Sequence, residues 1–430
     1  MLAAVSKAPT RAIAPRILIE TQSKRPNFYP MAATSEPLPQ HLKGLGYLSP
    51  LITVGFALFT DGFLYDMLVP LTPLSKGHVL DEGHEEFLYG GYALSVLILT
   101  PFFSWVAGRV GYKRCLVSGA LAQIIATILF AVAPSFEVLL IARFFQGASA
   151  AITWTVGLAL IAEGYPDQRV RSFGFMMSVT TFGLVLGPMA GGILFETSTT
   201  LPYYLACFLT ILDLAFRLIL LQHIPRLQIV KNPLFLLLRN REVLVAATVV
   251  AMVGWAWSGA IEPFLPNALV HDFHATAAEI GLIFTLSSVA YALVTWLVDE
   301  MEELKGLWPT IGLGVIMIAL GMPLLAVCPN LICAGVMLSV ISIAYAFAVN
   351  PTLAALADTV DRTATGAYAS VYAIFNIAYS IGTIGGDVAT GTLIRHFSVE
   401  TSFLVLSGLL LASVPLIRWG FRPRKVVDIA

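Results

Sequence analysis

The sequence is poor in charged residues. Lys, Arg, Asp and Glu make up 12% of its 430 residues, about half the share found in a soluble domain. Apolar residues make up 57%, and the mean hydropathy is +0.82. Such a chain lacks the polar surface that a water-soluble particle needs, so we predict an integral membrane protein. This excludes a soluble enzyme, a disordered chain and a small disulfide-rich secreted domain.

The sequence also lacks the features that several other function classes need. Its net charge of −1 creates no field that would attract nucleic acid. It has no GxxxxGK[ST] motif, no HExxH motif and no metal-ligand cluster. We therefore expect neither ATP-driven transport on this chain, nor an enzyme, nor a cofactor. Among four cysteines, Cys328 and Cys333 could meet, but CPNLIC is not a zinc or redox spacing. We interpret all four as free thiols in apolar surroundings.

Long apolar runs, by contrast, are abundant. A membrane-spanning helix needs about 20 mostly apolar residues, and about twelve such runs occur. The many glycines, 34 in all, favour closely packed helices over the strands of a membrane barrel. We predict an all-α membrane protein with spans near 48–70, 87–107, 115–133, 138–162, 173–194, 201–221, 243–262, 278–298, 307–327, 331–357, 367–392 and 401–420.

Lysine and arginine are distributed unevenly between the two sets of connections. The two tails, the end of the last span and every second connection carry 21 of the 25, whereas the opposite set carries only Lys76 and Arg395. Positive charge marks the cytoplasmic side, so we expect both termini in the cytoplasm. The tail before the first span lacks the apolar segment of a secretory signal, and Met31 is an alternative start. The predicted organisation is a tail (1–47), a six-helix bundle (48–221), a cytoplasmic loop (222–242), a second six-helix bundle (243–420) and a tail (421–430).

An internal repeat supports two related halves. GLVLGPMAGG, from Gly183 to Gly192, and GTIGGDVATG, from Gly382 to Gly391, share their spacing of small residues at an offset of 199. Duplicated six-helix halves are typical of secondary transporters, in which the substrate binds between the halves at the membrane midplane. Glycine every fourth residue creates a bare ridge, which predicts close packing against another helix, plausibly one from the other half. The conformational motif predicted here comprises Gly183, Gly187, Pro188, Gly191 and Gly192.

Ionisable residues inside apolar spans are costly, and each is therefore a candidate for function. Asp61 lies deep in the first span, Tyr65 shares its helical face, and Asp66 lies nearer the outer end. A carboxylate facing a closed cavity can take up a proton or pair with a cationic substrate. The alternative is a structural acid that is hydrogen-bonded to a neighbouring helix.

Charged residues in other spans also leave two interpretations open. Arg143 could face the cavity and tune an acid, or extend back to the membrane interface. Glu262 precedes two prolines that we expect to end the seventh span, where it could line an outer vestibule. Asp213 and Arg217, four residues apart, predict a structural ion pair. Additional candidates for contact with the substrate are Gln146, Asn376 and Tyr379.

These motifs together resemble the major facilitator superfamily over about residues 48–420, and within it the twelve-span drug:proton antiporter group. GLVLGPMAGG matches the antiporter motif of the fifth span, and RFFQGASAA matches the fourth-span motif linked to proton coupling. SWVAGRVGYKR resembles the loop motif between spans two and three, but it lacks that motif's first glycine and its acid. The motif residues that it keeps are Arg109, Gly111, Lys113 and Arg114.

A further likeness is to vesicular amine transporters. Asp61 stands nine residues before Pro70, as does that family's substrate-linked aspartate, and the EPFLP segment at Glu262 is similar to its seventh span. The family's second-span lysine and eleventh-span aspartate fall at Tyr92 and Asn376, so the resemblance does not imply a monoamine substrate. The sequence is also similar to fungal members of this branch that export small organic compounds or toxins.

We therefore predict a proton-coupled secondary transporter, most readily an antiporter that exports a small organic compound by alternating access. In this interpretation Asp61, Arg143 and Glu262 couple protons to the substrate. The alternatives are a symporter or facilitator that imports a solute, vesicular or vacuolar amine sequestration, and a non-transporting sensor. We expect a monomer in the plasma membrane, with a vacuolar or vesicular membrane as the alternative. The expected partners are a small organic substrate, protons and lipid.

Overall fold

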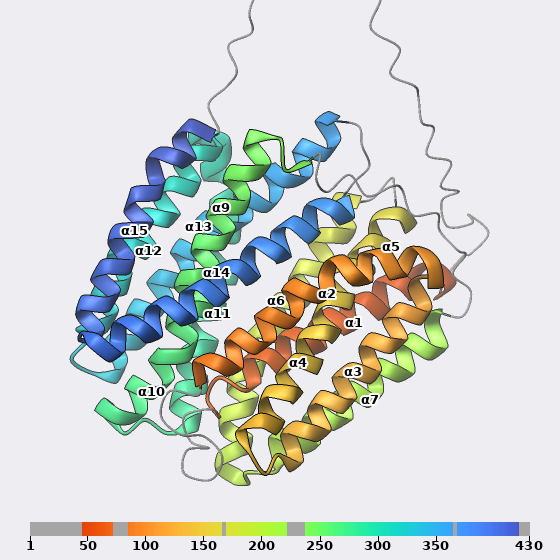
Figure 1. The fold of residues 1–430 in the computed structure, drawn as a ribbon, viewed down its shortest axis with the longest axis horizontal. Helices are drawn as coiled ribbons and strands as arrows, with labels where there is room; N and C mark the ends of the chain where they lie inside the picture. The colour runs from red at the N-terminus through yellow and green to blue at the C-terminus, as the bar shows by residue number, and fades with distance from the viewer. Residues whose placement is uncertain (1–44, 72–84, 166–168, 222–236, 364–367, 421–430) are drawn as a thin grey trace, which may run out of the picture. The chain divides into compact units, whose positions relative to one another are not determined.

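The structure, a computed structural model, is helical throughout the part that it describes (Figure 1). That part comprises residues 45–71, 85–165, 169–221, 237–363 and 368–420. It belongs to one compact unit, Ser35–Ala430. The all-α prediction is confirmed. Most of the predicted N-terminal tail, the C-terminal tail, residues 72–84 and most of the central loop lie outside the described residues, as does much of the positive charge on which the predicted orientation depends.

The helices follow the predicted apolar runs closely. Those of the first half are α1 (Leu45–Met67), α2 (Glu85–Val110), α3 (Tyr112–Val132), α4 (Phe136–Ile152), the π-helical turn η2 (Thr153–Gly157), α5 (Leu158–Gly164), α6 (Arg169–Thr197) and α7 (Leu201–Leu220). Those of the second half are α9 (Arg241–Ala256), the π-helical turn η5 (Trp257–Ile261), α10 (Glu262–Phe273), α11 (Ala277–Lys305), α12 (Leu307–Ala326), α13 (Leu331–Thr363), α14 (Tyr368–His396) and α15 (Val399–Gly420).

Helices occupy all twelve predicted span positions, but only eleven of them are long and apolar enough to be identified as spans from composition. The exception is α14, which has 29 residues and so extends roughly 43 Å. Its length is sufficient to cross a bilayer. Its hydropathy is lowered by Asn376, Asp387 and a run of glycine, serine and threonine. This helix, the eleventh of the twelve in chain order, packs against helices of both halves.

The predicted end of the seventh span at Glu262 is wrong. The chain stays helical through α9, η5 and α10 as far as Phe273. Pro263 lies in the first turn of α10, where the missing backbone N–H is tolerated, because the hydrogen-bond ladder is already offset by the π turn before it. Glu262 is consequently 3% exposed and lies inside the protein, not at an outer vestibule.

The glycine ridge of α6 packs against α1, which belongs to the same half. A Cβ at Gly187 would lie 2.6 Å from the carbonyl oxygen of Phe63, and a Cβ at Gly183 or Gly191 would collide with the backbone of α1 one turn to either side. Only glycine permits this approach. The prediction that the ridge reaches across to the other half is therefore wrong for these three residues.

The contact between the halves uses the neighbouring face of α6. A Cβ at Gly192 would collide with the backbone of α11 at Ala277, and a Cβ at Gly281 on α11 would collide with the carbonyl of Pro188. The Thr285 hydroxyl donates to the Val185 carbonyl oxygen at 3.0 Å. Helix α6 therefore carries two close-packing surfaces, one for its own half and one for the other.

Helix α14 has the corresponding position in the second half. It packs against α9 within that half and against α2 of the first half, and Figure 1 shows α14 running beside α2. Gly382 meets the backbone of α9 at Ala251, and a Cβ at Gly90 of α2 would lie 3.1 Å from the Asp387 carboxylate. The repeat in sequence is thus a repeat in packing.

Candidate functional site

Asp61 is positioned by the middle of α1 and is 6% exposed. Its Oδ2 accepts a hydrogen bond from the indole Nε1 of Trp154 at 2.9 Å. Its other oxygen, Oδ1, is buried with no hydrogen-bond partner among the described residues. A buried carboxylate oxygen without a donor is costly. The Asp61 carboxyl therefore has one vacant position that a proton or a cationic group would satisfy.

Arg143 of α4 is fully buried, with no exposed surface, so its side chain does not extend to the interface. Its Nη1 donates to the Gln146 Oε1 at 3.0 Å, and its guanidinium carbon lies 5.0 to 5.7 Å from the centroids of three aromatic rings: Tyr65, Tyr89 and Phe130. Its Nε and Nη2 are buried with no acceptor in the described part of the chain. Aromatic faces stabilise the cation, but they leave its other donors available.

A hydrogen bond between the halves closes this cluster. The Tyr65 hydroxyl of α1 donates to the Glu262 Oε2 of α10 at 2.9 Å. Glu262 also lies within hydrogen-bonding reach of Ser258 and Trp257, on the π turn that precedes it. One carboxylate is thus held by its own half and by the other half at once.

Asp66 and Tyr92 connect these groups into one cluster. Asp66 is close enough to Glu262 and Arg143 to interact with both charges. Tyr92 of α2 is close enough to Asp61, Arg143 and Glu262 to interact with all three, and its ring lies 4.8 Å from that of Tyr65. Asp66 therefore lies near the charged groups of the cluster, although it leaves the helical face that Asp61 and Tyr65 share.

The second half contributes uncharged groups to this region. The Tyr379 hydroxyl of α14 shares a 2.8 Å hydrogen bond with the Ser258 hydroxyl. The Tyr379 ring also stacks on Phe375, with centroids 6.3 Å apart. Asn376 lies on the same helix, and its Nδ2 is buried with no acceptor among the described residues. Aromatic and amide groups of this kind can bind the apolar and polar parts of an organic molecule.

The predicted ion pair between Asp213 and Arg217 is present within α7. Arg217 Nη2 lies 2.7 Å from Asp213 Oδ2. The same guanidinium donates to the Leu116 carbonyl oxygen at 2.6 Å and to the Thr153 hydroxyl at 3.3 Å. Thr153 is the first residue of η2 and immediately precedes Trp154. The ion pair therefore braces the π turn that carries the hydrogen-bond donor to Asp61.

The loop motif between α2 and α3 lies apart from the charged cluster. Gly111 has a positive φ of 89° and caps α3, a conformation that favours glycine. The Arg109 guanidinium lies 3.9 Å from the centroid of the Trp105 ring. Lys113 and Arg114 follow in the first turn of α3. These residues set the turn and the surface charge at one end of the helices.

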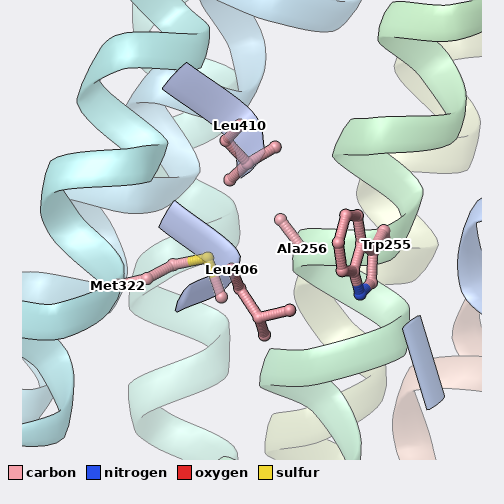
Figure 2. Close-up of a pocket in the computed structure, with 5 residues that line it drawn as sticks. All are labelled: Trp255, Ala256, Met322, Leu406 and Leu410. Atoms are coloured by element: carbon pink, nitrogen blue, oxygen red, sulfur yellow. The ribbon is translucent and has the colours of Figure 1, made fainter. Parts of the chain in front are cut away.

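The pocket shown in Figure 2 is not the substrate site. It lies within the second half, is lined by Trp255, Ala256, Met322, Leu406 and Leu410, and leaves no room for a water molecule. Ligand pockets usually enclose about 300–1,000 Å³ and present convergent polar groups. The described residues also contain no group of three side chains able to hold a metal ion. The charged cluster between the halves is therefore the candidate site.

Several contributors to the site escaped the sequence analysis, among them Phe130 and Trp154. Phe130 carried no signal, because it is one aromatic residue in an apolar run. Trp154 did carry one: it stands eleven residues after Arg143, about three helical turns, and so returns to the same face. An indole N–H on the face of a buried arginine needs an acceptor, and Asp61 provides it.

Comparison with known proteins gives the family. The model of the major facilitator superfamily matches residues 51–375 and 244–428. The chain belongs to this superfamily and is a transporter, not an enzyme. Among solved structures, the human organic anion transporter MFSD10 has a TM-score of 0.68 at 16% identity and covers 86% of this chain and 99% of its own. The nucleoside transporter NupG has a TM-score of 0.69 at 14% identity, covering 87% and 100%. At these identities both establish the fold alone.

Curated relatives that are more similar in sequence than these two structures include amine transporters. The human chromaffin granule amine transporter is 24% identical over 334 residues, which are 76% of this chain and 63% of that protein. The rat synaptic vesicular amine transporter is 25% identical over 337 residues, 76% of this chain and 65% of that protein. The chain thus spans just under two thirds of the length of these relatives.

Proposed function

We propose that this transporter exchanges protons for a small organic cation of the amine class. The observation that carries the proposal is the Asp61 carboxyl, which is buried and has one satisfied and one vacant oxygen. Such a group can hold a proton or an ammonium group, but only one of them at a time. Competition for a single position is the simplest physical basis for antiport.

The charge of the cluster favours a cationic substrate. The carboxyl groups of Asp66 and Glu262 lie near the Arg143 guanidinium, and Tyr92 connects the Asp61 carboxyl to the same cluster. When the three carboxyl groups and the guanidinium are all ionised, one positive and three negative charges leave a net charge of −2. Net charge in a low dielectric is costly, so the site gains most from a cation, from protons, or from both. An organic anion would increase the imbalance.

The Tyr65–Glu262 hydrogen bond joins the two halves, and its strength would depend on whether Glu262 carries a proton. A hydroxyl that donates to a carboxylate forms a stronger bond than one that donates to a neutral acid. Protonation of Glu262 therefore weakens a contact between the halves, and loss of the proton strengthens it. Alternating access requires that contacts between the halves break and re-form, and this contact would depend on the proton.

Flux in proteoliposomes tests the proposal. An imposed pH gradient should drive accumulation of a radiolabelled amine, and Asp61→Asn should reduce that accumulation at least tenfold, because the amide can take up neither the proton nor the cation. Asp272→Asn is the matched control, since Asp272 is an exposed acid whose ion pair is with exposed His271. Equal, gradient-independent flux through the wild type and Asp61→Asn would contradict the proposal.

The sign of the pH dependence separates antiport from the remaining alternatives. For an antiporter, acidifying the compartment that receives the amine should increase accumulation. For a proton symporter, acidifying the compartment that supplies the solute should increase it. A facilitator or sensor should respond to neither gradient. Uptake of matched carboxylic acids in place of amines would contradict the inferred substrate class while leaving the coupling intact.

A further inference from the structure

The turn between α12 and α13 brings two thiols together, and neither belongs to the charged cluster. Cys328 lies just after the end of α12, and Cys333 lies in the first turn of α13. Their Sγ atoms are 2.8 Å apart. Both side chains are half-buried, and both thiols are free in the structure.

The backbone on each side of the pair is fixed. The Cys328 N–H donates to the Leu325 carbonyl oxygen at 3.3 Å. The Asn330 side chain caps α13, because its Oδ1 accepts the Cys333 N–H at 2.8 Å. Helices α12 and α13 also pack closely against each other. The two sulfur atoms are therefore held in place and need to approach by only about 0.8 Å to reach bonding distance.

The predicted orientation places this pair on the oxidising side of the membrane. The residues between α12 and α13 include no lysine or arginine, and they belong to the set of connections that we predict to be non-cytoplasmic. Thiols facing the exterior or the lumen of the secretory pathway meet disulfide oxidants, whereas cytoplasmic thiols are kept reduced. The short distance between the two sulfur atoms and their predicted compartment therefore both favour a disulfide.

We propose that Cys328 and Cys333 form a disulfide that joins α12 to α13 at their non-cytoplasmic ends. The oxidant is an external disulfide, either of a small thiol such as glutathione or of a protein oxidase. One cysteine thiolate attacks this disulfide and forms a mixed disulfide, releasing one reduced thiol of the oxidant. The second cysteine thiolate then attacks the protein sulfur and releases the other. Two protein thiols lose two protons and two electrons, and the oxidant disulfide becomes two thiols.

The test is a count of free thiols in protein taken from its native membrane. Cells are quenched in acid, and the protein is denatured and treated with a maleimide polymer, with or without prior reduction. We expect two adducts before reduction, from Cys115 and Cys207, and four after it. The peptide that contains CPNLIC should be about 2 Da lighter in unreduced protein. This measurement on the wild type needs no variant that might fold poorly.

Two variants provide matched controls. Cys333→Ser and Cys328→Ser should each leave three thiols reactive before reduction, because the remaining partner of the pair becomes free. Four reactive thiols in the unreduced wild type, with no lighter peptide, would overturn the proposal. In Cys328→Ser cells, labelling of Cys333 by a membrane-impermeant maleimide reports the orientation separately, so a wrong topology is distinguishable from a pair that does not oxidise.

Discussion

Helices α6 and α14 are built on the same plan but present different chemistry. Gly183 and Gly382, 199 residues apart, each allow their helix to touch the backbone of the first helix of its own half. A second face of each then packs against the other half, α6 on α11 and α14 on α2. Between these surfaces stands Pro188 in α6 and Asp387 in α14. Backbone packing was retained in both copies, and the side chains at the same register diverged.

The two halves as a whole also share their helix packing and differ in the side chains that they bring to the site. The first half supplies Asp61, Asp66 and Arg143 to the site, whereas the second half supplies Glu262 and a group of aromatic residues. In that group the Trp257 and Tyr345 rings lie 5.4 Å apart. The lesson is that the duplicated element is the helical scaffold, and that charge was concentrated in one copy.

The largest expected effect concerns the ion pair of α7, which distinguishes the first half from the second. At the same offset of 199, the counterparts of Asp213 and Arg217 in α15 are Ala412 and Leu416. Arg217→Leu should reduce the free energy of unfolding by about 3–5 kcal/mol, because it leaves the Asp213 charge buried and unpaired. The double variant Asp213→Ala with Arg217→Leu, which copies the second half, should recover most of the loss. Unfolding by SDS titration in mixed micelles measures both, and a double variant no more stable than Arg217→Leu would count against this view.

The two glycine contacts should be equally intolerant of a side chain. Gly183→Leu and Gly382→Leu should each cost about 3 kcal/mol, since the added atoms meet backbone that cannot rotate away. The control is Gly385→Leu on α14, where a Cβ meets no atom within 4 Å. The measurement is the same SDS titration. A large cost at Gly183 with none at Gly382 would show that the halves do not share their packing.

Removal of the hydrogen bond between the halves should have a smaller effect. Tyr65→Phe deletes the donor to Glu262 and should cost about 1.5–3 kcal/mol, the usual value for a hydrogen bond to a charged group. It should also flatten the pH dependence of transport, since Glu262 then no longer holds α1. Tyr204→Phe, at a 70% exposed position, is the control. An unchanged pH profile in Tyr65→Phe would separate this contact from proton coupling.

The smallest effects are expected at two equivalent turns. Gly111 before α3 has a φ of 89°, and Gly306 before α12 has a φ of 90°. Gly111→Ala and Gly306→Ala should each cost about 1–2 kcal/mol, because the backbone at both positions lies in a region that is essentially reserved for glycine. Gly408→Ala, in open space within α15, should cost nothing and could stabilise the helix. Unequal losses at the two turns, measured by thermal unfolding in detergent, would mean that the repeat does not extend to its connections.

Much of the fold was predictable because the length of each apolar run can be read directly from the sequence. Every predicted span has a helix, and the glycine spacing correctly indicated close helix packing. The partner of the α6 ridge could not be read in this way, because a bare face is equally suited to any helix. The end of α10 was missed for a related reason: the prolines suggested a break, and nothing local reveals that a π turn accommodates them.

The site was less predictable than the fold. Asp61, Arg143 and Glu262 stood out as charges within apolar runs, and the structure places all three in one cluster. Their roles in coupling stay predictions. The spacing of Trp154 indicated the helical face on which it lies, but its contact with Asp61 depends on how η2 and α1 face each other across 93 residues of sequence, and nothing local names that partner. The fungal-type export branch and the membrane of residence likewise stay predictions.

The two π turns change the direction in which side chains point along the helices that contain them. A π turn accommodates one extra residue, so side chains beyond it are rotated by about 100° relative to an unbroken α-helix. Trp154 lies within η2 and reaches Asp61, and Glu262 directly follows η5 and reaches Tyr65. Both hydrogen bonds that define the site thus begin where the helical register is shifted by one residue. A deletion of a single residue in either turn would restore an even helix and rotate the partner of α1 out of reach.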